Sequence, residues 1–314
     1  MGGTISLMQT IYFSSARNRA LERLDKIRQG AWVSLVAPKE TELNDFAEKY
    51  NLDIDLLTDA LDLYEAPRVE IEEGKVYIFT RFCYPSGTEI ATEPLLIVYT
   101  AENLFTISRL DTPIYKRLLD QGKDILTTQK TKTLLLILSE ISNSYRIQLN
   151  KIYKQILHIR AQLRHSDTTP DLIRIIELEE DLNEFLSALQ PEIVMLKTLT
   201  SGKYIRLYED DKDLIDDLLL GAQELIEQTK SRLKTLTNIR QAFDAIATNN
   251  LNKTFKRLTS IAIFLTIPTI VGGLWGMNVN VPFASYPYAF AVVLGLGAIL
   301  TMFVVVIFHR KRWL

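Results

Sequence analysis

Two long uncharged stretches stand near the C-terminal end of the sequence: LTSIAIFLTIPTIVGGLW at residues 258–275 and YAFAVVLGLGAILTMFVVVIF at residues 288–308. A helix of about 20 apolar residues spans the roughly 30 Å hydrocarbon core of a bilayer. We therefore predict two transmembrane helices at these positions. An external loop at residues 276–287, which carries no charge, would join them.

Basic residues flank this hairpin on its outer sides. Lys253, Lys256 and Arg257 precede the first stretch, and a basic tail at residues 309–314 (HRKRWL) follows the second. Positive residues stay on the cytoplasmic side of a membrane. We therefore expect a multi-pass protein of the cell (plasma or inner) membrane with both termini in the cytoplasm.

The N-terminal part of the chain and the C-terminal part with the two apolar stretches carry opposite net charges. The 314 residues include 36 Lys and Arg against 38 Asp and Glu. Residues 1–244 carry a net charge of −8, whereas residues 245–314 hold no acidic side chain and carry +6. The absence of a basic arm in the acidic part argues against nucleic acid as a partner.

Other classes are excluded by what the soluble part lacks. A single cysteine, Cys83, rules out an intrachain disulfide framework and a multi-cysteine metal site. Neither a glycine-rich phosphate loop nor a nucleophile–base pair stands out in the sequence. We therefore expect no enzymatic activity and no organic cofactor.

The soluble part begins as a mixed α/β domain. A strand is predicted at residues 31–36, helices at 40–50 and 53–63, and short β-rich runs at 69–72, 75–84, 95–99 and 103–108. The predicted class is an α+β membrane protein with an N-terminal cytoplasmic α/β domain, a long helical stalk and two C-terminal transmembrane helices. Its segments would be an α/β domain (1–125), an antiparallel helical pair (126–210), a stalk helix (211–257), transmembrane helix 1 (258–275), an external loop (276–287), transmembrane helix 2 (288–308) and a basic cytoplasmic tail (309–314).

The stalk is predicted to continue into the first span without a break. Apart from Gly221, no Gly or Pro interrupts the chain between residue 211 and the membrane. A heptad-like register joins Leu218, Leu225, Ile239 and Ile246, with Arg232 at its middle position. A register of this kind predicts a parallel oligomeric stalk.

One face of the first span, and of the helix leading into it, is small or polar. At steps of three and four it carries Asn252, Phe255, Thr259, Ala262, Thr266, Thr269 and Gly273. Small residues allow helices to pack closely, and hydroxyls on such a face can bind water or a neighbouring helix. The pattern leaves two interpretations open, close helix packing and the lining of a pore. Two spans per chain cannot enclose an aqueous path, so a pore would need several copies.

A set of short motifs indicates a family. Gly276-Met277-Asn278 stands at the outer end of the first span and Asn252-Lys-Thr-Phe255-Lys256 at its inner end. An APRVE segment at residues 66–70 opens a strand, and the chain ends in KRWL. Together these motifs resemble the CorA family of magnesium transporters over essentially the whole chain.

The resemblance implies a homopentamer in the lipid bilayer that admits a hydrated divalent cation passively, driven by the membrane potential and gated by intracellular magnesium. Magnesium would be the main ion, with cobalt or nickel also transported. Gly276, Met277 and Asn278 would form the selectivity filter, with Asn278 meeting the ion. The pore and gate positions that the resemblance implies are Asn252, Phe255, Leu258, Thr266 and Thr269, of which Phe255 and Leu258 would form a hydrophobic constriction.

Regulation is where the sequence departs from the family. Asp217 matches a stalk aspartate that binds regulatory magnesium between subunits, but no Asp lies between Leu63 and Leu110 to partner it. Glu89 or Glu93 would have to serve instead. The acidic run around Asp217 also fits a favourable helix N-terminus with no metal.

Two other functions remain open. One is a zinc transporter of the ZntB type coupled to protons, although a site for bare zinc favours Cys or His ligands and the tail offers only His309. The other is a membrane-tethered sensor or scaffold. A plain anchor gives no reason for a small polar helix face that ends at Asn278.

Overall fold

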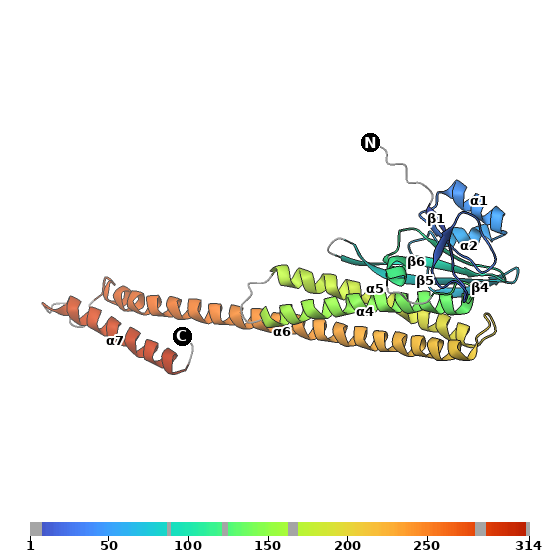
Figure 1. The fold of residues 1–314 in the computed structure, drawn as a ribbon. Helices are drawn as coiled ribbons and strands as arrows, with labels where there is room; N and C mark the ends of the chain where they lie inside the picture. Colours follow the sequence, from blue (N-terminus) through green and yellow to red (C-terminus); the bar gives the residue numbers. More distant parts are fainter. Residues whose placement is uncertain (1–7, 87–88, 121–124, 163–168, 280–286, 312–314) are drawn as a thin grey trace. The chain divides into compact units, whose positions relative to one another are not determined.

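The computed structural model describes residues 8–86, 89–120, 125–162, 169–279 and 287–311. The chain forms two compact units, Met1–Asn238 and Ile239–Leu314. An N-terminal α/β domain leads into a helical region, one very long helix and a final apolar helix (Figure 1). This arrangement confirms the predicted fold class.

A seven-stranded sheet organises the first unit. Its spatial order is β2-β1-β3-β7-β6-β5-β4, in which β3 and β7 are parallel and all other neighbours are antiparallel. The strands are β1 (Met8–Phe13), β2 (Glu22–Leu24), β3 (Trp32–Val36), β4 (Arg68–Glu72), β5 (Lys75–Ser86), β6 (Glu89–Tyr99) and β7 (Leu104–Ser108). Glu73 and Gly74 both have positive φ, as a two-residue hairpin between β4 and β5 requires.

The two faces of the sheet are covered differently. Helices α1 (Glu40–Tyr50) and α2 (Ile54–Asp59) pack on the face that carries Val33, Leu35 and Phe105. The opposite face lies against α4 (Lys130–Gln162) and α5 (Thr169–Thr200) (Figure 1). Helix α3 (Pro113–Asp120) packs on α4, and its Tyr115 ring contacts Trp32 of β3. The Tyr145 hydroxyl fixes α4 to β5 by donating to the Arg81 carbonyl at 3.0 Å.

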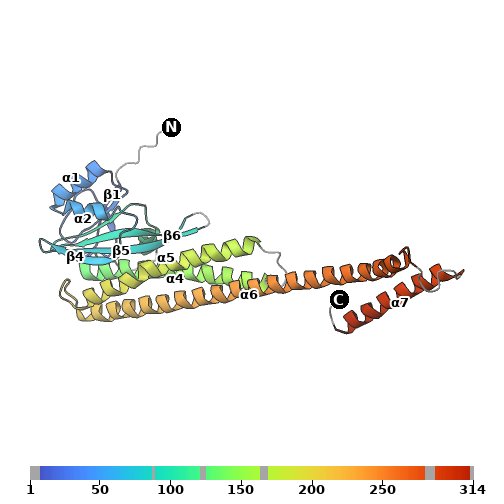
Figure 2. The same ribbon diagram turned by 180° about the vertical axis from the view of Figure 1, so that it is seen from behind.

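Helix α6 (Glu209–Trp275) is continuous over 67 residues, as the missing stop signals predicted. Figures 1 and 2 both show its N-terminal part beside α4 and α5. Helix α7 (Ala289–Arg310) follows the Gly-Met-Asn segment.

The heptad-like register of α6 has a different role from the one predicted. Leu218 and Leu225 of this register are buried inside a single copy of the chain. The Arg232 guanidinium lies over the Tyr153 ring of α4 at 3.9 Å, which explains a charged residue in the middle of an apolar stripe. Over this segment the stripe is therefore intrachain core, and the predicted oligomeric contact is wrong there.

A buried carboxyl on α5 predicts a specific pH dependence. Glu192 is 1% exposed, and neither carboxyl oxygen has a hydrogen-bond partner among the described residues. Burial raises its pKa from 4.5 to about 8, so the folded protein keeps a proton that the unfolded chain releases. Stability should therefore fall as pH rises from about 4.5 to 8 and level off above that range.

Glu192→Gln, which cannot ionise, should flatten this decline. Thermal unfolding of the full chain between pH 5 and 8.5 measures it, with Glu180→Gln, an exposed position on the same helix, as control. If the stability of Glu192→Gln fell with pH as steeply as that of the unmodified protein, Glu192 would not be the cause of the decline.

Candidate ion pathway

Among the residues that the structure describes, two helices are long and apolar enough to cross a membrane: α7 and the C-terminal part of α6. Only 11% of the most apolar window of α6 and 6% of that of α7 are buried. A core helix of a soluble domain would be mostly buried. These two helices therefore present apolar surface that the described part of a single chain does not cover, as expected of helices that cross a membrane.

Helix α7 packs on one defined face of α6. The Phe264 and Phe308 rings lie 5.7 Å apart between centroids. A Cβ placed on Gly297 of α7 would lie 3.9 Å from Val271 Cγ1 and 4.0 Å from Pro268 Cα. Phe264, Pro268 and Val271 follow each other at steps of four and three, so they form a single stripe along α6.

The small polar face of α6 lies on the other side of the helix. At 100° per residue, its centre is about 180° from the stripe that contacts α7. All seven of its members are exposed: Asn252, Phe255, Thr259, Ala262, Thr266, Thr269 and Gly273. Packing against the chain's own second span therefore does not account for this face.

The threonines on this face are arranged as hydrogen-bond acceptors. Thr266 Oγ1 donates to the Ala262 carbonyl at 2.8 Å and Thr269 Oγ1 to the Leu265 carbonyl at 2.9 Å. Each hydroxyl has one proton, and that proton is used within the helix. The remaining lone pairs of these two exposed hydroxyls can accept a hydrogen bond from water or from a neighbouring group.

The Gly-Met-Asn segment begins where α6 ends. The Gly276 amide still donates to the Gly272 carbonyl at 2.9 Å, so the helical bonding closes at this residue. Met277 and Asn278 follow immediately and are both exposed. Asn278 is thus an exposed residue two positions beyond the last helical hydrogen bond of α6.

Gly276→Ala is predicted to reduce ion flux about tenfold. A Cβ at Gly276 would lie 3.2 Å from the Gly272 carbonyl oxygen, so the turn that carries Asn278 must shift. Gly272→Ala is the matched control, because a Cβ there meets nothing within 4 Å. Flux into proteoliposomes measures both variants, and equal flux in the two would contradict this explanation for the glycine.

The predicted regulatory residues are not gathered within one chain. Asp217 lies exposed on α6, whereas Glu93 lies on β6 and is 2% exposed. Glu89 begins β6, but its side chain is outside the described residues. Among the described residues, no group of three His, Cys, Asp or Glu side chains could hold a metal ion.

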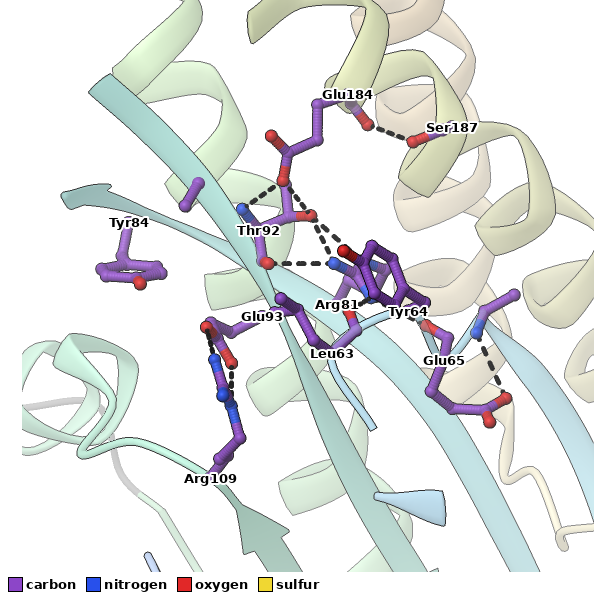
Figure 3. A pocket seen from close by; sticks show the side chains of 12 residues that line it. Leu63, Tyr64, Glu65, Arg81, Tyr84, Thr92, Glu93, Arg109, Glu184 and Ser187 are labelled. Carbon is purple, nitrogen blue, oxygen red and sulfur yellow. Dashed lines mark hydrogen bonds and ion pairs between the residues drawn. The ribbon is translucent and has the colours of Figure 1, made fainter. Parts of the chain in front are cut away.

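Glu93 already has a partner at the edge of a cavity of about 680 Å³ (Figure 3). It accepts two hydrogen bonds from Arg109, from Nε at 3.1 Å and from Nη2 at 2.6 Å, and this contact raises the pKa of the arginine. Across the cavity, Glu184 accepts from the Thr92 amide at 2.7 Å and hydroxyl at 2.8 Å. A cation could use Glu93 only by displacing Arg109, which weighs against this residue as a metal ligand.

The CorA-like Mg²⁺ transporter protein family matches residues 28–310 of this chain. The chain belongs to this family. The family consists of divalent-cation transporters, which are not enzymes. Among its curated relatives, the cobalt/magnesium transport protein CorA of Methanocaldococcus jannaschii is 26% identical over 90% of this chain and 91% of its own length. The magnesium transport protein CorA of Helicobacter pylori is also 26% identical, over 90% of each chain.

Solved structures share the same fold. The complete CorA magnesium transporter from M. jannaschii superposes with a TM-score of 0.88 at 23% identity, covering 99% of this chain and 100% of that one. The ZntB cytoplasmic domain from Vibrio parahaemolyticus reaches a TM-score of 0.64 at 9% identity, covering 77% of this chain and 98% of that one. At these identities the likeness concerns the fold alone, and in the ZntB domain it concerns the soluble part alone.

Proposed function

We propose that several copies of this chain, five by family resemblance, form a membrane channel for magnesium. The observation that carries the proposal is the exposed polar face of α6, opposite the α7 contact, which ends at Gly276-Met277-Asn278. Entry would be passive and driven by the membrane potential, and cobalt or nickel would also pass. Both termini would lie in the cytoplasm.

The chemistry of this face suits a hydrated ion. Magnesium binds oxygen octahedrally and gives up its water reluctantly. Its first-shell waters point their hydrogens outward, so a pore that keeps them must supply acceptors. Thr266 and Thr269 supply hydroxyl lone pairs, and a ring of Asn278 side chains would supply amide oxygens. Residues 245–314 contain no Asp or Glu side chain that could strip the ion of its water.

The inner end of the face would hold the gate. Phe255 and Leu258 are 54% and 63% exposed, and they follow Asn252 within two turns of the same helix. Apolar side chains brought together from several copies would form a constriction that closes by excluding water.

Intracellular magnesium would regulate this gate through Asp217. The residue is exposed on α6, the helix that continues as the pore face, so a metal bound between copies there would act on the same element. Its partner in a neighbouring copy would be Glu89 or Glu93, and the Arg109 pair makes Glu93 the weaker candidate.

Ion flux into proteoliposomes tests the proposal. The protein is reconstituted with a magnesium-sensitive dye inside and a potassium diffusion potential, inside negative. Magnesium uptake that follows the voltage is the expected result. Zinc uptake that follows a proton gradient, without magnesium flux, would contradict the magnesium channel and favour a proton-coupled zinc transporter. If folded protein carried neither ion, the tethered-sensor function would be favoured.

A further inference from the structure

Helix α5 contains Pro191 in its interior, and the two halves on either side of this proline are held in different ways. The first half is tied to the sheet, because Glu184 accepts hydrogen bonds from the Thr92 amide at 2.7 Å and from the Thr92 hydroxyl at 2.8 Å. In the described part of the chain, the second half, residues 192–200, forms no hydrogen bond or ion pair with another helix or strand. Side-chain packing therefore holds the second half in place.

Pro191 makes the junction between the two halves a weak point of the helix. Proline has no amide hydrogen, so it cannot donate the helical hydrogen bond to the Ser187 carbonyl. A helix bends most easily where such a bond is missing. Residues 192–200 can therefore move at this junction while the first half stays on the sheet.

The second half buries one carboxyl group among apolar side chains. Glu192 is 1% exposed, and Met195, Leu196 and Leu199 of the same half are each at most 1% exposed. Neither carboxyl oxygen of Glu192 has a hydrogen-bond partner among the described residues. Since burial without partners penalises the charged form, the pKa of Glu192 is raised to about 8, and the packed helix keeps the carboxyl proton.

No neighbouring group compensates a charge on Glu192. The ionisable side chains around this core, from α4, α5, β5 and β6, are Tyr145, Asp181, Glu184, Arg81, Cys83 and Glu93. Of these, the Tyr145 phenol is the group whose pKa Glu192 raises, together with burial. The charged residues of β4 lie on the opposite face of the sheet, where Arg68 covers the Phe79 ring. An ionised Glu192 would therefore have no partner in the packed helix.

We propose that Glu192 acts as a pH-sensitive latch on the second half of α5. With its proton bound, residues 192–200 pack on the core. When the proton leaves to solvent, this half moves away from the core at Pro191 and brings the carboxylate to water. Residues 201–208 connect it to α6, so the latch lies directly before the long helix. This inference is independent of ion transport.

Hydrogen–deuterium exchange of the full chain in detergent, read by mass spectrometry between pH 6 and 9 and corrected for the intrinsic exchange rates, tests the latch. The packed half holds a proton that the released half gives up. The protection of residues 193–200 should therefore fall about tenfold per pH unit up to about pH 8 and level off above it. The protection of residues 175–185, in the first half, should not follow this course.

Glu192→Gln and Glu192→Met keep a side chain of similar length that cannot ionise, so both should remove the pH dependence. Glu180→Gln, at an exposed position of the first half, is the matched control and should retain it. The proposal is overturned if the two Glu192 variants keep the decline, or if the unmodified protein shows none. It is equally overturned if residues 175–185 lose protection as steeply as residues 193–200, because the whole domain would then be opening.

Discussion

Asn278→Ala is expected to reduce magnesium flux by about 100-fold or more. The amide stands directly after the last residues of α6 and is exposed where the polar face ends. In an oligomer the substitution removes one amide from every copy at the same level of the pore. A hydrogen bond to a charged partner contributes about 1.5–3 kcal/mol, and 1.4 kcal/mol corresponds to a factor of ten. Losing two such bonds to a hydrated ion already accounts for the expected drop.

Asn250→Ala is the control for this experiment. It removes the same side chain from α6, at an exposed position off the polar face. Asn278→Gln keeps the amide but displaces it by one methylene, so intermediate flux is expected. Voltage-driven dye uptake in proteoliposomes measures all three variants. Near-normal magnesium flux in Asn278→Ala would show that Asn278 does not line the ion pathway, and it would contradict the proposed selectivity filter.

The double variant Thr266→Val, Thr269→Val is expected to reduce magnesium flux at least about tenfold. Valine has nearly the shape of threonine, so the helix and its packing should persist while the hydroxyls are lost. Each hydroxyl now donates to its own helix and leaves an acceptor on the exposed face. At about 1 kcal/mol for each lost hydrogen bond, two positions per copy suffice for the expected effect.

Thr301→Val tests whether the effect depends on the face. Thr301 Oγ1 makes the same kind of bond on α7, to the Gly297 carbonyl at 2.8 Å, but it is half-buried and away from the polar face. Its loss should leave flux unchanged. A similar loss of flux in both variants would mean that the hydroxyls only stabilise helices, and the pore-lining role of α6 would be abandoned.

Some parts of the fold escaped prediction because their local signals are weak. Strands β1 and β2 and helix α3 were not predicted. β2 is three residues long, and it gains stability from pairing with β1, as in Ile11 opposite Leu24. Helix α3 has only eight residues and is held by the Arg117–Glu140 ion pair of 2.7 Å to α4. Contacts distant in sequence stabilise such elements, and a local pattern cannot contain them.

The sequence likewise predicted some features of the candidate site and missed others. Periodicity identified the polar face of α6, and local motifs identified Asn278, because both depend on residues close together in the chain. The same periodicity misassigned Leu218 and Leu225, since an apolar stripe does not say whether its partner is another copy or another helix of the same chain. The Arg109 pair of Glu93 joins neighbouring strands and could not be read from spacing either.

The sequence by itself determined the membrane spans, the continuous long helix, the family and the small polar face, because hydropathy, helix stop signals and short motifs are local properties of the chain. Only the tertiary structure decided which side of α6 faces α7, which leucines belong to the intrachain core and which carboxylates are already paired. These properties depend on side chains that meet across long sequence separations. The packing of the whole fold specifies each of these long-range contacts, and no single segment of the chain does so.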